Sequence, residues 1–536
     1  MSDSQLLRGT MILSAGIFIT KMLGLIYIFP FTAIVGHEGL ALYQYGYTPY
    51  TVLLSLATLG VPLAVSKFVS KYNALGDYRT GQRLLRSGLI IMSVTGVIAF
   101  FILFSAAEMI ANRVLDPDSL NGNTVEDAVF TIRMVSVALL IVPVMAVIRG
   151  FFQGHQSMGP TAVSQVIEQI IRIAFILIVT YWIMNMTTGN LGTAVGFATF
   201  GAFAGAVGGL AVLLVYWKRR APGLKQQVRD STVDHQIPLT SMYKELFRYA
   251  VPLSFVGLAI PMYQSIDLWT FNPAMQAAGF SLEQAETYFA SFGQSSHKLI
   301  LIPVSIATAM SMTILPTVTS AYTNQEHDRL QRTITQTYQI ILFLTIPAAG
   351  GLAVVAQPMY GTLFGLEEVA AGSDILRVYA PTAVLFAVFA VTASLLQGIN
   401  KQKYAVLALI AGVAFKLASN SLFILWFGPE GGVFATMGGY ILSVSINVWA
   451  VGRFAQFDYH VIRRRLLQIT AFTAVMLLIT GYLAWALMQI FPMDSRTNAA
   501  IVLSLSVAAG ILIYGVLTIK TGIAGKVLGH RFSILK

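Results

Sequence analysis

The stretch that decides the fold is residues 87–110, SGLIIMSVTGVIAFFILFSAAEMI, in which the only charged side chain is Glu108. As an α-helix it would be about 36 Å long, enough to cross the roughly 30 Å hydrocarbon core of a bilayer. Arginines precede this stretch and aspartates follow it. We therefore predict a transmembrane helix whose first end lies in the cytoplasm.

The same pattern recurs along the whole chain. Hydrophobic residues make up 56% of the 536 positions and charged residues make up 11%, whereas soluble proteins carry about 25% charged residues. The composition is therefore that of an all-α polytopic membrane protein. We predict about fourteen transmembrane helices, at residues 10–35, 46–69, 87–110, 128–152, 161–184, 191–217, 247–270, 288–320, 334–356, 374–398, 405–427, 433–452, 466–491 and 498–519.

Basic residues indicate how these helices are oriented. Of the 34 lysines and arginines, 24 fall in the termini and loops of one side, when Arg248 at the very start of span 247–270 is counted with the loop before it, and only Arg113 and Arg496 fall on the other. Loops rich in lysine and arginine stay in the cytoplasm, so both termini are predicted to be cytoplasmic. The remaining eight basic residues lie inside the spans: Lys21, Lys67, Arg133, Arg149, Arg172, Lys298, Arg377 and Lys416.

An offset of 244 residues indicates that the chain contains two related halves. When residues 133–182 are placed on 377–426 without a gap, eight of the 50 pairs are identical. The rare polar residues coincide: Arg133 meets Arg377, Gln153-Gly154 meets Gln397-Gly398, and Arg172 meets Lys416. Such a parallel repeat is typical of transporters whose substrate path lies between two halves.

The repeat divides the chain into three predicted parts. An N-terminal lobe, 1–230, holds the first six spans and leads into a basic cytoplasmic linker at about 218–246. A second six-helix lobe occupies 247–460. Residues 461–536 hold the last two spans and a cytoplasmic tail.

The basic residues within the spans differ in their depth. Four lie near a membrane surface, where long side chains can reach water or headgroups: Lys67 and Arg149 near the cytoplasmic side, Arg133 and Arg377 near the external side. Four others lie about ten to twelve residues, or roughly 15 Å, into their spans: Lys21, Arg172, Lys298 and Lys416. A charge at that depth costs at least about 2.5 kcal/mol, so these four are expected to face a cavity or an ion-pair partner.

Span five carries a polar stripe at helical spacing, formed by Gln165, Glu168, Gln169 and Arg172. Glu168 and Arg172 are four residues apart, so they can pair within the helix. Two interpretations stay open. The pair either neutralises itself and holds helices together, or it takes part in transport.

Spans seven and eleven hold the other polar groups. Lys416, Ser419 and Asn420 form a second stripe, on span eleven. Asp267, toward the outer part of span seven, is interpreted either as half of a structural ion pair or as a carboxylate that couples transport to a cation.

Lys21 and Lys298 have no carboxylate one helical turn away. In a parallel repeat spans one, two, seven and eight occupy matching places at the junction of the two halves, and these lysines lie on the first and the eighth span. Two lysines there would form a cationic cavity that suits phosphate or pyrophosphate. The predicted substrate is therefore an anion.

Several function classes are excluded. The chain has no cysteine, no GxxxxGK[ST] loop and no HExxH motif, which argues against disulfides, ATP hydrolysis and a zinc protease. The seven histidines are scattered, so no metal or other cofactor is expected, and no cleavage site for a signal peptide is recognised. The net charge of +11 comes from the cytoplasmic loops, so no nucleic acid is expected as a partner. Gly201, Gly205 and Gly209 are interpreted as a helix-packing face.

Short motifs along the whole chain carry a resemblance to a known family. They are 8–10 (RGT), 21–24 (KMLG), 60–67 (GVPLAVSK), 149–154 (RGFFQG), 158–162 (MGPTA), 396–398 (LQG) and Lys416 with Asn420. With these motifs the chain resembles the multidrug/oligosaccharidyl-lipid/polysaccharide exporter superfamily. Within that superfamily it is similar to the MurJ-type lipid II flippases of the YtgP/SpoVB-like branch.

This resemblance implies two six-helix lobes around a central cavity, with spans thirteen and fourteen forming a groove for a lipid tail. It also implies that Lys21 and Lys298 hold a pyrophosphate, each being a lysine where relatives carry arginine. Some relatives bind sodium with residues that Asp267 and Asn420 resemble. Lys416 departs from that site, because its ammonium group could replace the ion.

The expected function is the transfer of an undecaprenyl-pyrophosphate-linked peptidoglycan precursor, lipid II, from the inner to the outer leaflet of the bacterial cytoplasmic membrane by alternating access. The protein is expected to be a monomeric transporter and not an enzyme, with cell wall synthesis enzymes as partners. Its expected driving force is the membrane potential or a coupling ion. The expected supporting residues are Arg149, Glu168, Arg172, Asp267, Arg377, Lys416 and Asn420. Two alternatives stay open: a flippase for another polyprenyl-linked oligosaccharide of the capsule or O-antigen type, and a cation-coupled multidrug exporter.

Overall fold

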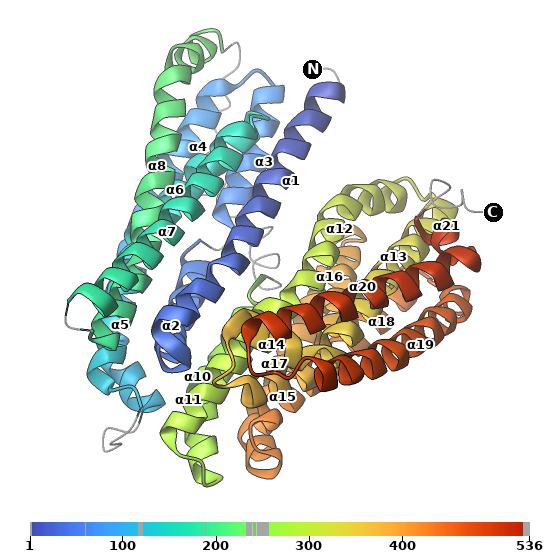
Figure 1. Cartoon of the computed structure of the whole chain (residues 1–536). Helices are drawn as coiled ribbons and strands as arrows, with labels where there is room; N and C mark the ends of the chain where they lie inside the picture. The colour runs from blue at the N-terminus through green and yellow to red at the C-terminus, as the bar shows by residue number, and fades with distance from the viewer. Residues whose placement is uncertain are drawn as a thin grey trace. The chain divides into compact units, whose positions relative to one another are not determined.

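A computed structural model of the chain describes residues 3–58, 60–115, 122–187, 189–231, 238, 243 and 257–528. Within these residues the secondary structure is helical and contains no β-strand (Figure 1). The predicted all-α fold is therefore confirmed. The chain divides into two compact units, Met1–Trp269 and Thr270–Lys536, which are described separately below.

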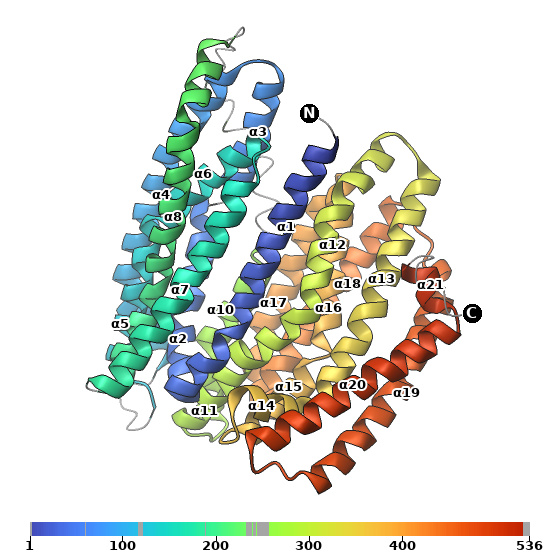
Figure 2. The ribbon, with the colours of Figure 1, turned by 45° about the horizontal axis from the view of Figure 1, so that its top comes forward.

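The described residues of unit 1 form eight α-helices before the segment that leads to α10. They are α1 (Asp3–Ile26), α2 (Ile28–Thr58), α3 (Val61–Ala74), α4 (Tyr78–Val114), α5 (Val125–Ser136), α6 (Val142–Gly154), α7 (Gly159–Met186) and α8 (Leu191–Arg229). In both views of the ribbon, α7 lies between α1 and α8 (Figures 1 and 2). The helix α10 (Ala259–Ala277) crosses the boundary between the units.

Unit 2 continues from α10 with the helices α11 (Leu282–Ala290), α12 (His297–Thr323), α13 (His327–Val354), α14 (Ala356–Phe364), α15 (Val369–Tyr379), α16 (Thr382–Gly398), α17 (Gln402–Phe427), α18 (Glu430–Phe454), α19 (His460–Ile490), α20 (Arg496–Lys520) and α21 (Ile523–Leu528). A six-residue π-helical turn, Ser291–Ser296, joins α11 to α12.

The number of membrane crossings remains partly open. Ten helical segments in the described residues are long and apolar enough to cross a bilayer, and α15 with α16, bent by 42°, adds an eleventh if they form one span. Residues 247–256 of the predicted seventh span lie outside the described residues. The total of fourteen and the side of the termini stay predictions.

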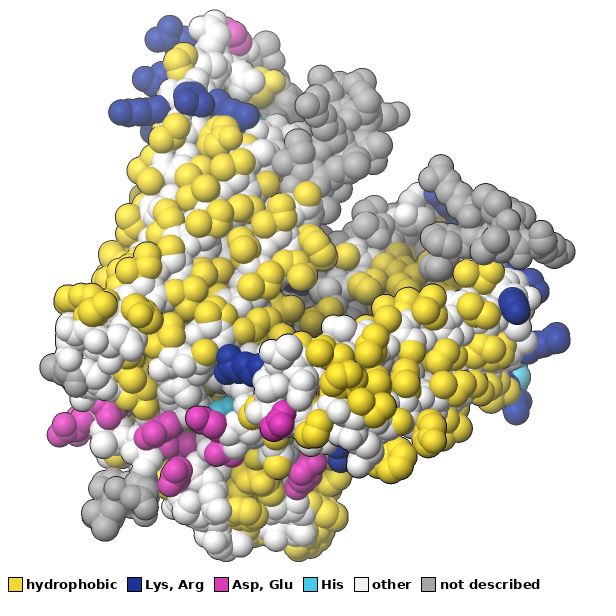
Figure 3. Space-filling view, in the orientation of Figure 1, with side chains coloured by type: hydrophobic (Ala, Val, Ile, Leu, Met, Phe, Trp, Pro, Cys, Tyr) yellow, Lys and Arg dark blue, Asp and Glu magenta, His cyan; other side chains and the backbone are white. Residues whose placement is uncertain are grey.

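At two places the helices of the structure differ from the predicted boundaries. The predicted second span, 46–69, is interrupted where Gly60 adopts a left-handed conformation, φ 68°, and Pro62 begins α3. The predicted linker at 218–246 begins as helix, because α8 continues to Arg229. Trp217 and Leu224 pack against the core of α3, α4 and α6, while the basic side chains between them stay exposed at the end of α8 (Figure 3). Hydropathy alone does not detect such an amphipathic extension.

Residues that lie 244 positions apart in the chain make the same contacts in the two units. Ser157 N donates to Phe152 O at 3.0 Å in unit 1, and Lys401 N donates to Leu396 O at 2.7 Å in unit 2. Both bonds close the same helix-ending turn, with Gln156 and Asn400 each at φ 56°. The turns after the fourth and tenth predicted spans therefore have one geometry.

Helix packing follows the same repeat. A Cβ at Gly154 would lie 2.7 Å from Val69 Cβ on α3, and one at Gly398 would lie 3.0 Å from Val318 Cβ on α12. Thus α6 packs on α3 as α16 packs on α12. These contacts support the predicted parallel repeat.

The last two long helices pack on α13. Pro347 has no N–H, so the carbonyl of Phe343 loses its usual helical partner. Tyr514 of α20 donates to that carbonyl at 2.9 Å. At the basic start of α19, Arg465 hydrogen-bonds to Gln339 of α13. These bonds fix α19 and α20 to α13 within unit 2.

Candidate functional site

The polar stripe of α7 packs against the glycine face of α8. A Cβ at Gly205 would lie 2.7 Å from the carbonyl oxygen of Glu168, and one at Gly209 would lie 3.1 Å from Glu168 Cβ. At Gly201 it would lie 2.7 Å from Ile176. The interpretation of these three glycines as a helix-packing face is therefore confirmed, and their lack of side chains makes room for the charges of α7.

Three charged side chains meet at this packing face. Glu168 Oε1 accepts a hydrogen bond from Arg172 Nη2 at 2.8 Å, across the i, i+4 spacing that the sequence indicated. Glu168 Oε2 accepts another from Arg149 Nη2, also at 2.8 Å. Each of the three side chains is 13 to 15% exposed. A single carboxylate thus joins two arginines, and the group carries one net positive charge.

Arg149 was expected near the cytoplasmic end of its span, where it could reach water, and also as a supporting cavity or ion-pair residue. Its side chain points into the bundle from α6 and pairs with Glu168. Its Nε and Nη2 atoms donate to Ser164 Oγ at 3.2 and 2.7 Å, and Ser164 Oγ in turn donates to Gly209 O at 2.9 Å. The interhelical carboxylate of Glu168 accounts for this setting, because it offers Arg149 a partner inside the bundle.

A series of tyrosines continues from Arg172 across α2. Arg172 Nη1 donates to Tyr47 Oη at 3.3 Å. The ring of Tyr47 stacks on Tyr43 with 5.3 Å between centroids, and Tyr27 donates to Tyr43 Oη at 3.5 Å. Hydrogen bonds and one ring stack therefore connect the charged group of α6 and α7 to the break between α1 and α2.

The other predicted residues of unit 1 lie on α1 and α10. Lys21 is exposed on α1. This helix packs on α7, since a Cβ at Gly16 would lie 2.9 Å from Ala162 Cβ and one at Gly24 would lie 3.3 Å from Gln169 Nε2. Asp267 of α10 is only 4% exposed.

In unit 2, Lys416 is fully buried. Its Nζ atom donates to Thr436 Oγ1 of α18 and lies 5.3 Å from the centroid of the Phe292 ring. One turn further along α17, Asn420 Nδ2 donates to Thr270 Oγ1 at 2.7 Å. A hydroxyl group and an aromatic face thus contribute to holding this ammonium group.

Lys298 follows the π-helical turn and is half-buried at the start of α12. The preceding residue, His297, shares a hydrogen bond of 2.9 Å with Tyr379 Oη. The Tyr379 ring also packs on Phe292, with 4.9 Å between centroids, and Lys416 lies over the Phe292 ring. Contacts between side chains therefore connect the start of α12 to Lys416 on α17. π-Helical turns are rare and occur often at functional sites.

Arg377 has a different setting from the other predicted residues. It pairs with Asp374 at 3.5 Å on α15, and both side chains are 55% exposed. An exposed pair of this kind contributes little to stability. Within the described residues, no group of three or more histidine, aspartate or glutamate side chains could hold a metal ion.

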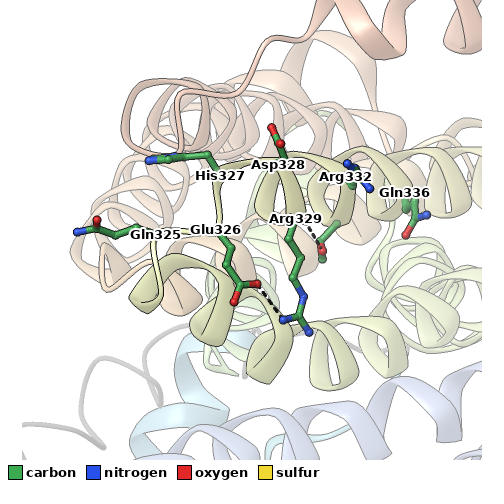
Figure 4. Close-up of a pocket in the computed structure, with 8 residues that line it drawn as sticks. Gln325, Glu326, His327, Asp328, Arg329, Arg332 and Gln336 are labelled. Carbon is green, nitrogen blue, oxygen red and sulfur yellow. Dashed lines mark hydrogen bonds and ion pairs between the residues drawn. The ribbon is translucent and has the colours of Figure 1, made fainter.

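The turn between α12 and α13 forms a hollow of about 680 Å³ at the surface of unit 2 (Figure 4). Its lining comes from one short segment that runs from Gln325 to Gln336. Arg329 Nη1 donates to Glu326 Oε2 at 2.9 Å, and this hydrogen bond lowers the pKa of the Glu326 carboxyl. The hollow lies apart from the charged groups of α12 and α17, and its exposed ion pair resembles ordinary protein surface.

Sequence reasoning missed four side chains that complete these groups: Ser164, Tyr47, Thr436 and Phe292. Only Ser164 had a local signal, because it lies four residues before Glu168 on the same face of α7. The other three come from neighbouring helices, and no spacing along the chain connects them to their cations.

Comparison with known proteins gave long matches. The family described as "Polysaccharide biosynthesis protein" matches residues 6–322. The "Lipid II flippase MurJ" of Bacillus subtilis is 44% identical over 99% of this chain and 98% of its own length. The "Stage V sporulation protein B" of the same organism is 22% identical over 96% of this chain and 95% of its own length.

Solved structures match over most of the chain as well. A structure titled "Lipid II flippase MurJ, inward closed conformation" has a TM-score of 0.66 at 14% identity, covering 97% of this chain and 99% of that one. An inward-facing multidrug transporter of the MATE family also has a TM-score of 0.66, at 16% identity, covering 82% of this chain and 95% of that one. At such identities the likeness shows the fold alone.

Proposed function

The chain belongs to the polysaccharide biosynthesis family of membrane proteins, and we propose that it is a flippase that moves lipid II from the inner to the outer leaflet of the bacterial cytoplasmic membrane. It thereby supplies precursor for cell wall synthesis. The observation that carries this proposal is the end-to-end match, at 44% identity, to a relative named as a lipid II flippase.

The charges of the spans suit such a substrate. A lipid-linked pyrophosphate is an anion, and Lys21 and Lys298 are the cations that we assign to it. Lys21 is exposed on unit 1 and Lys298 is half-buried in unit 2. Strong, charge-assisted bonds from ammonium groups to phosphate oxygens supply the affinity. We assign Asp267 and Asn420 no ion of their own, because Lys416 already supplies a fixed cation on the helix of Asn420.

Transport then proceeds by alternating access, with fourteen spans, two six-helix lobes and both termini in the cytoplasm. The groove for the lipid tail lies along α19 and α20. A potential that is negative inside favours outward movement of an anion by about 2.3 kcal/mol per charge per 100 mV, or about 4 to 5 kcal/mol for two charges. Flipping in proteoliposomes should therefore slow when an imposed potential is collapsed with an ionophore.

The test of this function uses cells in which this chain is the only lipid II flippase. Lipid II in the outer leaflet is measured by its accessibility to a lipid II-cleaving enzyme added outside. Wild-type protein should make lipid II accessible, and Lys21→Ala and Lys298→Ala at matched expression should reduce accessibility at least tenfold. Arg463→Ala is the control, because Arg463 is an exposed cation at the start of α19.

Two outcomes would change the proposal. If the lysine variants behave as wild type, lipid II remains the substrate but its phosphate binds elsewhere. If well-expressed wild-type protein fails to support growth, another polyprenyl-linked oligosaccharide becomes the better candidate.

The orientation has its own test, which the lack of cysteine in the chain simplifies. Gln227→Cys at the exposed end of α8 and Glu367→Cys between α14 and α15 each introduce a single thiol. A membrane-impermeant thiol reagent should label position 367 in intact cells and position 227 only after lysis. The reverse pattern would contradict cytoplasmic termini.

A further inference from the structure

The charged group of unit 1 has more cation than its internal carboxylate balances. Arg149, Glu168 and Arg172 carry two positive charges and one negative charge, and each side chain keeps 13 to 15% of its surface exposed. A pair that only holds helices together is most stable when it is neutral and fully hydrogen-bonded. An excess charge in a membrane span instead indicates a place for a second anion.

The two arginines differ in how fully they are bonded. Arg149 is held by three hydrogen bonds, two to Ser164 and one to Glu168. Arg172 makes one short bond to Glu168 and one bond of 3.3 Å to Tyr47. Its Nε atom is buried without a hydrogen-bond partner in the described part of the chain. Arg172 is therefore the arginine with donors to spare.

The surroundings fix the direction from which an anion can reach Arg172. On the α8 side, a Cβ at Gly205 would already lie 2.9 Å from Arg172 Cβ, so no space exists there. On the α2 side, Tyr47 is only half-buried. An incoming oxyanion therefore approaches Arg172 beside the hydroxyl of Tyr47.

We propose that Glu168 is a tethered substitute for a substrate oxyanion at Arg172, and that a phosphate or carboxylate oxygen of the transported headgroup displaces it. This inference rests on the proposed function. In the empty protein Glu168 bridges both arginines. When the headgroup binds, its oxyanion takes the bond from Arg172, while Glu168 stays with Arg149. Glu168 then regains Arg172 and speeds release of the headgroup.

Purified full-length protein tests this exchange by calorimetry. The two probes are inorganic pyrophosphate and N-acetyl-D-alanyl-D-alanine, which represent the phosphate and the peptide carboxylate of the headgroup. Glu168→Gln keeps a side chain of the same shape but removes the competing charge, so it should bind one of the probes about tenfold more tightly, equivalent to about 1.4 kcal/mol. Lipid II flipping by the same variant should be slower, because release is slower. The probe that gains affinity identifies the source of the oxyanion.

A double variant separates this exchange from a general change in charge. If the gain in affinity depends on Arg172, the double variant Arg172→Gln/Glu168→Gln should not show it. Glu326→Gln is the matched control, since Glu326 also pairs with an arginine but on the surface. Its affinity for both probes should equal that of wild type.

The opposing results are equally clear. Unchanged or weaker binding of both probes by folded Glu168→Gln would overturn the proposal and leave the group as a structural ion pair. If Glu168→Gln does not fold, Glu168→Asp is measured instead. Its shorter carboxylate reaches Arg172 less well, so its affinity for one of the probes must still rise, although by less than tenfold. The binding assay needs no lipid II, so a gain in affinity without flipping by wild type would contradict the proposed function alone.

Discussion

Arg172 in unit 1 and Lys416 in unit 2 occupy equivalent positions of the internal repeat, yet their surroundings and their exposure differ. Arg172 pairs with a carboxylate one turn earlier on its own helix and remains 15% exposed. The offset of 244 puts Gly412 at the position of that carboxylate in unit 2. There, Lys416 is fully buried, bonds to the Thr436 hydroxyl and lies over the Phe292 ring.

The difference shows what each cation can do. A carboxylate on a flexible side chain at a partly exposed site can exchange with another anion. Lys416 is fully buried, with the Thr436 hydroxyl and the Phe292 ring among its contacts, so an anion from solution cannot reach its ammonium group, which acts as a fixed charge. The repeat thus provides one exchangeable and one permanent cation at matching positions.

The largest effect should come from removing the bridging carboxylate. Glu168→Leu leaves two arginines without their common counter-ion, which should cost about 3 to 5 kcal/mol of unfolding free energy. The melting temperature in detergent should fall by several degrees. Glu326→Leu, the surface counterpart, should change it little, and an equal loss for both would contradict the account.

A smaller loss of unfolding free energy should follow from filling the space that α8 leaves for these charged side chains. Gly205→Val places methyl groups against the backbone of Glu168, where a Cβ would already lie 2.7 Å from the carbonyl oxygen. Overpacking of this kind should cost up to about 3 kcal/mol. Gly223→Ala on the same helix is the control, because nothing lies within 4 Å of a Cβ there. If both variants have the same melting temperature, α7 and α8 do not pack as closely as described.

Thr436→Val should weaken unit 2 by about 2 kcal/mol. It removes a hydrogen-bond acceptor from a buried charged group, whereas the shape of the side chain is kept. Measurement of thermal unfolding checks this value. A change below about 0.5 kcal/mol would mean that the hydroxyl group does not hold Lys416.

The corresponding change in unit 1, Tyr47→Phe, should cost about 0.5 kcal/mol. Its bond to Arg172 is 3.3 Å long and the tyrosine is half-buried, so water can replace the hydroxyl. A loss as large as that of Thr436→Val, in the same unfolding assay, would remove the contrast between the two cations.

The smallest effect concerns pH. The hydrogen bond from Arg329 lowers the pKa of Glu326 from its ordinary value of 4.5. Because the folded-state pKa is the lower one, the ionised carboxylate stabilises the protein above pH 4.5, and this contribution is lost as the pH falls through the folded-state value. Wild type and Glu326→Gln should therefore differ slightly in melting temperature at pH 6 and converge near pH 3. A difference in melting temperature that grows as the pH falls would contradict the lowered pKa of Glu326.

Much of this arrangement follows from local sequence. Apolar length predicts the long helices, and the i, i+4 spacing predicts that Glu168 and Arg172 can meet, because both depend only on neighbours along the chain. The offset of 244 also aligns the two stretches whose turns and packing contacts recur in the two units.

Other features depend on contacts between helices. Arg149 was expected either to reach water or to join an ion pair, and its sequence neighbours do not reveal that Glu168 of α7 is its partner. The contact of Phe292 with Lys416 joins residues 124 positions apart. The continuation of α8 through its basic end depends on Trp217 and Leu224 finding a core on α3, α4 and α6. No pattern along the sequence contains these partners.

The most direct test of the central claim measures flipping by the purified protein. Proteoliposomes would be prepared with lipid II in both leaflets, and the fraction cleaved by an enzyme added outside would be followed with time. The account predicts that wild-type protein and Arg463→Ala make the inner pool accessible, whereas the double variant Lys21→Ala/Lys298→Ala leaves it protected. If folded wild-type protein left the inner pool as protected as empty liposomes do, the assignment as a lipid II flippase would be contradicted.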